Sequence, residues 1–197
     1  MTVDRGQAHT LEAFMAALIV VSGVLFALGA TAVTPLSAST SNQHIQNQQL
    51  VAANDLLAAS AANGTLRESA VYWNATANGF EGATDGGYYT AGGPPTPFGA
   101  ALNETFRDER IAFNVYVGYW DGASPRQRPM VYMGSPSDNA VTASRTVTLF
   151  NDTALTAPGE TRNVSVASAA GDFYAPDVAP GNELFNVVEV RIVLWRM

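Results

Sequence analysis

The sequence contains no cysteine and no lysine, and each absence excludes a class of chemistry. Without cysteine there is no disulfide framework, no thiolate-bound metal site and no cysteine nucleophile. Without lysine there is no P-loop cation and no Schiff base with a substrate. Because His9 and His44 both precede residue 65, a Ser-His-Asp triad or a histidine-bound metal is excluded from the rest of the chain.

The charge balance is acidic, with ten Arg against seventeen Asp plus Glu and a formal net charge of −7. Affinity for nucleic acid comes mostly from clustered cations, so no nucleic-acid partner is expected. Arginine without lysine, together with an excess of carboxylates, resembles the composition of proteins from extreme halophiles, in which acidic surfaces favour solubility. A GC-rich genome that replaces lysine codons by arginine codons is the alternative.

The 197 residues suffice for one domain of ordinary size and an extra element, which lies at the N-terminus. No charged side chain occurs between residues 13 and 54, and residues 13–33 are mostly aliphatic. As a helix with a rise of about 1.5 Å per residue, that run is about 31 Å long, close to the thickness of a hydrocarbon core. The sequence predicts a polar leader over 1–6 and a transmembrane helix over 7–34.

Three interpretations of this segment differ in what the finished protein keeps. A secretory signal would be cut near the small residues 30–32, and a signal anchor would be kept whole. A pilin-type signal would be cut at the end of the leader, so that the apolar helix begins the mature chain.

The third interpretation rests on a resemblance. Arg5-Gly6, then Gln7, then Thr10-Leu11-Glu12 before the apolar run resemble the class III signal of type IV pilins. More narrowly, residues 5–39 are similar to haloarchaeal pilin-like membrane proteins of uncharacterised function. The resemblance implies that a prepilin peptidase cuts after Gly6, that Gln7 becomes the first residue, and that the helix packs with other pilin-like subunits in a filament.

Glu12 is the residue to which the resemblance gives an assembly role. In a filament, its carboxylate would pair with the free α-amino group of a neighbouring subunit and fix the axial register. Bacterial pilins have this glutamate fifth in the mature chain, whereas Glu12 would be sixth. The alternative is that Glu12 lies in the hydrated headgroup zone, where a carboxylate at the edge of a span is not costly.

Charge and sequons predict the orientation. Arg5 precedes the span and the next basic residue is Arg67, which favours an N-terminus inside the cell. Five Asn-x-Ser/Thr sequons lie beyond the span, none with proline in the middle, and they predict an external, N-glycosylated region. The acceptors are Asn63, Asn74, Asn103, Asn151 and Asn163. The expected location is the cell membrane with an extracellular head, or a surface filament.

A second, amphipathic helix is predicted as a stalk over 35–64, because Pro35 interrupts the first run and Asn63-Gly64 is a plausible stop. Its apolar stripe would need cover from the head or from another subunit. The stripe consists of Ile45, Ala52, Leu56 and Ala59, flanked by Leu50, Leu57 and Ala61. Thr65-Leu-Arg-Glu68 matches a capping box and predicts a short helix.

Residues 65–197 are predicted to form an extracellular α+β head that is mostly antiparallel β structure, so that the whole chain has a pilin-like fold class. The Gly/Pro-rich residues 76–97 predict a long, exposed surface loop, and 98–108 a brief helix. Alternating apolar residues predict the strands. These cover 111–119, 130–133, 141–150 and 188–194.

Carboxylates are the groups that remain for catalysis. On a helix, Glu104 and Asp108 would share a face and could serve a divalent cation or glycosidic acid–base chemistry. Interleaved Arg107 and Arg110 favour a solvated charged face instead. The loop carboxylates Asp172, Asp177 and Glu183 could bind calcium weakly, but nothing in their spacing singles them out. No catalytic residue, cofactor or metal site is therefore predicted.

The leading hypothesis is a structural subunit, or an accessory subunit, of an archaeal type IV pilus-like surface filament, anchored and assembled through its N-terminal helix. Membrane lipid, other subunits and the prepilin peptidase are its expected partners. Two alternatives stay open. One is a monomeric single-pass surface protein whose head binds a ligand or an envelope partner, and the other is an anchored hydrolase that uses carboxylates alone.

Overall fold

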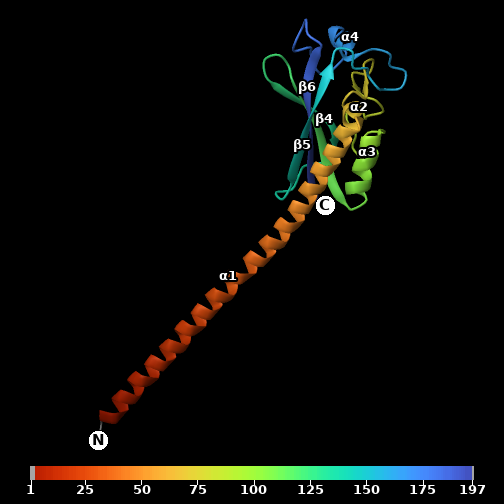
Figure 1. Ribbon diagram of the computed structural model, residues 1–197. Helices are drawn as coiled ribbons and strands as arrows, with labels where there is room; N and C mark the ends of the chain where they lie inside the picture. Colours follow the sequence, from red (N-terminus) through yellow and green to blue (C-terminus); the bar gives the residue numbers. More distant parts are fainter. Residues whose placement is uncertain (1–2, 197) are drawn as a thin grey trace. The chain divides into compact units, whose positions relative to one another are not determined.

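The structure of the protein, a computed structural model, describes residues 3–196, and the side chains of 9–28 and 43–196 within them. The chain forms two compact units, Met1–Ile45 and Gln46–Met197. The N-terminal unit is the first part of helix α1 (Val3–Ala62), and the C-terminal unit holds the rest of α1 and every other element (Figure 1).

Helix α1 continues through Pro35, so the predicted separation into a helix over 7–34 and a stalk over 35–64 is wrong for the backbone. A proline inside a helix removes one hydrogen bond and crowds the preceding turn, but the bonds on either side can hold the helical geometry. The boundary between the compact units lies at Ile45/Gln46 instead. The last turns of α1 therefore belong to the same unit as the predicted head.

Those last turns bury one face of α1. Leu56 and Leu57 are buried as the pattern predicts, but Ala59 is exposed. Gln49 and Ser60 are buried as well. The buried face of α1 is therefore rotated around the helix relative to the predicted apolar stripe, and it includes two polar side chains. Gly64, with a φ of +83°, follows the end of α1 and confirms the predicted stop.

Helix α2 (Thr65–Ala70) confirms the predicted short helix, but not its capping box. The N-cap is Gly64, which offers no side chain, and Thr65 is already the first helical residue. The Thr65 hydroxyl instead donates to Asn63 Oδ1 at 2.7 Å. The left-handed Gly64 shifts the start of the helix by one residue relative to the motif.

The Gly/Pro-rich residues 76–97 are irregular as predicted, apart from a small hairpin of β1 (Trp73–Asn74) with β2 (Gly79–Phe80). The prediction of an exposed loop is wrong for much of the segment. The Tyr89 N–H donates to the Met130 carbonyl at 2.9 Å, and the Tyr89 carbonyl accepts from the Tyr132 N–H at 2.8 Å. These bonds hold the segment against a sheet edge, because unpaired edge groups are satisfied by any extended backbone.

Next come α3 (Pro97–Leu102) and a π-helical turn, η1 (Asn103–Arg107), which confirm the brief helix predicted over 98–108. Thr96 caps α3 by accepting from the Gly99 N–H at 3.3 Å. Gly99 is required by close approach, since a Cβ there would lie 1.9 Å from the Pro94 carbonyl oxygen. Helix and loop thus pack backbone to backbone.

Four antiparallel strands form the main sheet in the order β4-β3-β6-β5. All four predicted strands are confirmed, and three of them are longer than predicted. Helix α4 (Val164–Ala169), capped by Asn163, lies between the last two strands in sequence and was not predicted. The strands are β3 (Ile111–Trp120), β4 (Pro125–Tyr132), β5 (Val141–Phe150) and β6 (Leu184–Arg196).

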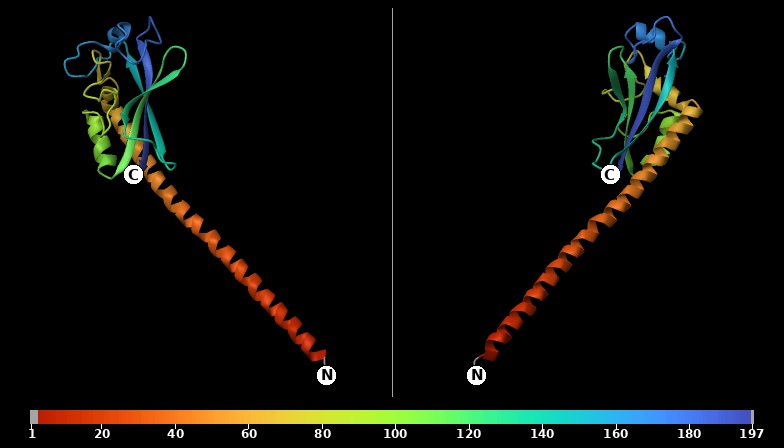
Figure 2. Two further views of the ribbon diagram at one scale, coloured as in Figure 1. Left: turned by 180° about the vertical axis from the view of Figure 1, so that it is seen from behind. Right: turned by 60° about the vertical axis from the view of Figure 1, so that its left-hand side comes forward.

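One face of this sheet is buried against the helices. The last turns of α1, together with α2 and α3, lie on the same side of the sheet (Figures 1 and 2). Strand alternation then places the neighbouring side chains of the central strands on the opposite, outer face. The buried apolar side chains that β3 and β6 contribute to this core include Phe113, Val115, Val117, Phe185, Val188, Val190, Ile192 and Leu194.

Trp73 is the centre of an aromatic cluster at one end of this core. Its ring meets Phe80 and Tyr174 edge-on, with centroids 5.3 Å away in each case. Its indole N–H donates to the Asp172 carbonyl at 2.7 Å, and the Arg128 guanidinium lies 4.6 Å from the ring centroid. The hairpin, β4 and the loop before β6 are therefore joined through one side chain.

Arg162 fixes the loop between β5 and α4. Its guanidinium donates to both carboxylate oxygens of Glu160 and to Asp172 Oδ2, each at 2.9 Å. These bonds to the Glu160 carboxylate lower its pKa to about 2. The ionised glutamate is thus the form that the fold stabilises.

We expect Leu57→Ala to destabilise the C-terminal unit by about 2–5 kcal/mol, because it leaves a cavity between α1 and the sheet. Leu57 is fully buried, whereas Val51 on the same helix is 58% exposed. Val51→Ala is the matched control and should change stability by about 0.5 kcal/mol or less. Urea unfolding followed by tryptophan fluorescence measures both, and equal effects would contradict the packing.

We expect acid to destabilise the protein partly through Glu160. Its pKa is about 2 when folded and about 4.3 when unfolded, so its contribution is full above pH ~4.3 and is lost as the pH falls toward 2. Glu160→Gln should flatten the fall in the free energy of unfolding between about pH 5 and pH 2. Urea titrations across that range test this, with the exposed Glu183→Gln as control; an unchanged slope in Glu160→Gln contradicts it.

Candidate functional site

The outer face of the sheet carries one row of residues that crosses all four strands. Gly118 of β3 pairs with Gln127 of β4 on one side and with Glu189 of β6 on the other. Glu189 in turn pairs with Thr146 of β5. Because neighbouring strands lie about 4.8 Å apart, the row spans about 14 Å across the sheet. It carries three polar side chains and a gap at the glycine.

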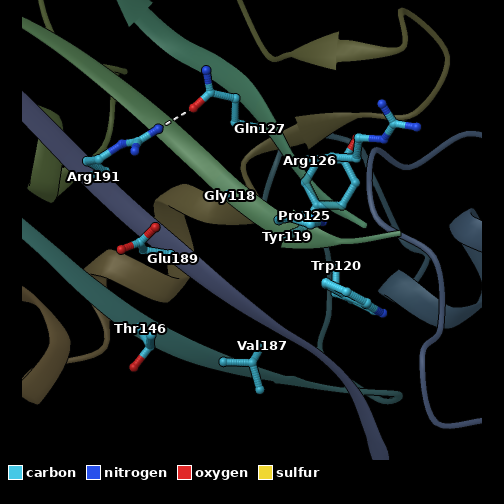
Figure 3. A pocket seen from close by; sticks show the side chains of 10 residues that line it. All are labelled: Gly118, Tyr119, Trp120, Pro125, Arg126, Gln127, Thr146, Val187, Glu189 and Arg191. Carbon is cyan, nitrogen blue, oxygen red and sulfur yellow. Dashed lines mark hydrogen bonds between the residues drawn. The ribbon is translucent and has the colours of Figure 1, made fainter. Parts of the chain in front are cut away.

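Gly118 makes the centre of this row a hollow. A Cβ at this position would meet the Cβ and carboxylate of Glu189 at 3.6 Å, so the absence of a side chain leaves the space above β3 open. Residues of all four strands line the resulting hollow of about 470 Å³ (Figure 3).

An apolar row borders the hollow at one end. Trp120 is 46% exposed and pairs with Pro125 across β3 and β4, while Val187 of β6, also 46% exposed, pairs with Thr148 of β5. An aromatic ring with this much exposure in a sheet face is available to a partner.

A polar row borders the other end. The Arg191 guanidinium lies 5.7 Å from the centroid of the Tyr116 ring, to which Arg191 is the cross-strand partner. It also donates to Gln127 Oε1, as the dashed line in Figure 3 shows. Tyr116 and Gln127 therefore restrict the orientation of the Arg191 side chain.

Asp121 fixes the turn that carries Trp120. Its carboxylate accepts from Arg126 Nε at 2.6 Å and from the backbone N–H groups of Ser124 and Ala123 at 2.6 and 2.8 Å. The bonds from Arg126 first, and then from those N–H groups, hold the pKa of Asp121 well below its usual range. Arg126 is therefore already paired, and Arg191 and Glu189 are the remaining opposite charges of the lining.

The sequence singled out none of these residues. The alternation over 111–119 placed Tyr116 and Gly118 on one face, but strand pairing and register, which create the row, cannot be read from a single strand. The carboxylates that the sequence did single out lie elsewhere. Glu104 and Asp108 are exposed at the π-helical turn, and Asp177 accepts from the Ala179 N–H at 2.9 Å.

The described side chains of the N-terminal unit give a different kind of candidate site. His9–Leu28 has a mean hydropathy of 2.3 and is long and apolar enough to cross a membrane, as a membrane anchor or a signal sequence near an N-terminus would be. Its large apolar side chains are exposed, and Glu12 lies 3.8 Å from His9 Nδ1 at its start. Arg5, Gly6 and Gln7 lie outside the described side chains.

Residues 5–194 match a protein family described as a family of unknown function, DUF7288. The chain belongs to this family. The match includes both the apolar segment and the sheet, so the DUF7288 region extends over both compact units. No curated protein and no solved structure matches the chain. The likeness of residues 5–39 to pilin-like proteins stays a prediction.

The five sequon asparagines of the DUF7288 protein differ in the use of Nδ2, the atom to which a glycan would be attached. Asn74 donates from Nδ2 to Glu81 Oε2 at 2.6 Å, and Asn151 to the Asn182 carbonyl at 2.7 Å. Among the described residues, the other three sequon asparagines use only Oδ1, as acceptors from Thr65, Gly93 and Val166. They are Asn63, Asn103 and Asn163, and Asn63 is exposed.

We expect any N-glycan on the native DUF7288 protein at Asn63 in preference to Asn74 and Asn151, because in the last two an acceptor atom already lies within 2.7 Å of Nδ2 and a sugar there would compete with it for space and for one of the two hydrogens. Glycopeptide mass spectrometry measures the occupancy. Asn63→Gln should remove one glycan mass and Asn151→Gln none. A glycan on Asn151 with Asn63 unmodified would contradict this order.

Proposed function

We propose that this protein is a pilin-like surface subunit, held in the membrane and assembled through α1, with its head outside the cell. The observation that carries the proposal is that one uninterrupted helix has two environments. Its residues 9–28 expose large apolar side chains, whereas Leu56 and Leu57 are buried in the C-terminal unit. Lipid or sister helices would cover the first part, and the sheet covers the second.

The side chains of the apolar segment support helix association. Small residues gather on one side of the helix at three- and four-residue spacing, and such a surface lets helices approach closely in a membrane. They are Ala13, Ala16, Ala17, Gly23 and Ala27. Phe14, Leu18 and Leu25 lie toward the opposite side, where they would face lipid or further helices.

Glu12 supports the assembly role proposed for it. Its side chain is 82% exposed, and its carboxylate lies 3.8 Å from Nδ1 of His9, one turn earlier. Cleavage after Gly6 would create an α-amino group in a neighbouring copy, and a carboxylate at the start of the span would be its natural counter-charge. The same carboxylate in a monomer would lie at the hydrated membrane surface.

The second candidate function is a monomeric anchored surface protein whose head binds a ligand. The hollow on the outer sheet face, with its exposed Trp120, favours it. The two functions are compatible, since a filament subunit can carry a binding site on its exposed head.

We expect the intact mass of the protein purified from its native membrane to lack residues 1–6, because a prepilin peptidase would cut after Gly6. Gly6→Phe should block the cut, because the peptidase would accept only a small residue there, and should leave the full-length mass. Gly23→Phe, deeper in the span, is the control and should be processed normally.

Shearing of whole cells separates the two candidate functions. A filament subunit appears in the sheared, sedimentable fraction with the mass of the processed chain, and Gly6→Phe abolishes its release. Full-length protein that stays with the membrane supports the monomeric anchor. A free protein that begins near Val33 would contradict both.

A further inference from the structure

The outer hollow has an arrangement of polar and apolar groups that restricts what it can bind. Its middle row presents the flat polar groups of Gln127 and Glu189 on either side of the gap at Gly118. Trp120 presents an aromatic surface at one end. A ligand that fits must therefore combine an apolar face with hydroxyl or amide groups at its edges.

Charge excludes several ligands. Because Arg126 is paired with Asp121, Glu189 and Arg191 leave the hollow without excess charge, in a chain of net charge −7. A polyanion such as nucleic acid gains too little here, since its affinity depends on several unpaired cations. A lipid chain would need a continuous apolar lining, which Glu189 and Arg191 interrupt.

We infer that this hollow is a binding site for a neutral saccharide. The C–H groups of a sugar ring would stack on Trp120, which is the largest exposed apolar surface of the lining. The ring hydroxyls would donate to the Glu189 carboxylate and accept from the Arg191 guanidinium and the Thr146 hydroxyl. The volume of about 470 Å³ lies within the range of small-molecule sites.

The polar side chains of the hollow are already positioned to bind such a ligand. Gln127 and the Tyr116 ring hold Arg191 in place, so its guanidinium loses little freedom on binding. In the part of the chain that the structure describes, the Glu189 carboxylate and the Thr146 hydroxyl make no hydrogen bond to protein, so both can bond to a sugar without breaking the fold. The inference does not depend on filament assembly, and it names the ligand class of the exposed head.

The test is a glycan array that carries neutral and sulfated oligosaccharides, probed with the full-length chain in a detergent without a sugar headgroup. We expect binding to neutral glycans. Trp120→Ala and Glu189→Gln should each weaken it about tenfold or more, as loss of a stacking surface or of a charged hydrogen bond does. Phe150→Ala removes an aromatic side chain of similar exposure, 41%, outside the hollow, and should bind as the wild type does.

Gly118→Val separates loss of the site from loss of the fold. A Cβ there meets Glu189 at ordinary contact distance, and β-branched residues suit strands, so the urea midpoint should not fall. The added methyl groups fill the hollow, so binding should be lost.

Three outcomes would overturn the inference: no neutral glycan bound, sulfated glycans alone bound, or Phe150→Ala as damaging as Trp120→Ala. Competition by glycans released from the native protein itself identifies the source of the sugar. Competition indicates a neighbouring copy and its absence another envelope glycan, and either result supports a saccharide site.

Discussion

Burial of one sheet face under the helices is the interaction on which the rest of the C-terminal unit depends. Leu57 of α1 and Phe98 of α3 meet the apolar side chains of β3 and β6 in a single core. Because a strand alternates its side chains, covering one face fixes which residues the other face presents. The outer row with its hollow at Gly118 is thus a consequence of the same packing that stabilises the unit.

The irregular segments are held by a few side chains with several partners each. Trp73 joins the hairpin, β4 and the loop before β6, and Arg162 ties that loop to the one after β5. Asp121 holds the β3–β4 turn by accepting hydrogen bonds from the Ser124 N–H and from Arg126 Nε. The Asp121 contacts hold the turn that follows Trp120 at the edge of the hollow. A binding surface on an exposed sheet gains from such rigidity, because little ordering is needed when a ligand arrives.

Local sequence signals were reliable where a single element was at stake. Apolar alternation located all four strands of the sheet, and Asn63-Gly64 located the end of α1, because both depend on neighbours within a few residues. Signals that depend on context were not reliable. Pro35 does not end the helix, Gly64 replaces Thr65 in the capping arrangement, and Gln49 and Ser60 take buried positions that the apolar pattern assigned elsewhere.

The sequence by itself determined the apolar span, the α+β class and the positions of the strands, because hydrophobic runs and alternation are local properties of the chain. Tertiary structure alone decided the candidate binding site. Gln127, Gly118, Glu189 and Thr146 are far apart in sequence, and only the strand order β4-β3-β6-β5 and its register bring them into one row. The physical reason is that backbone pairing between strands carries no residue code, so register follows from how the whole core packs.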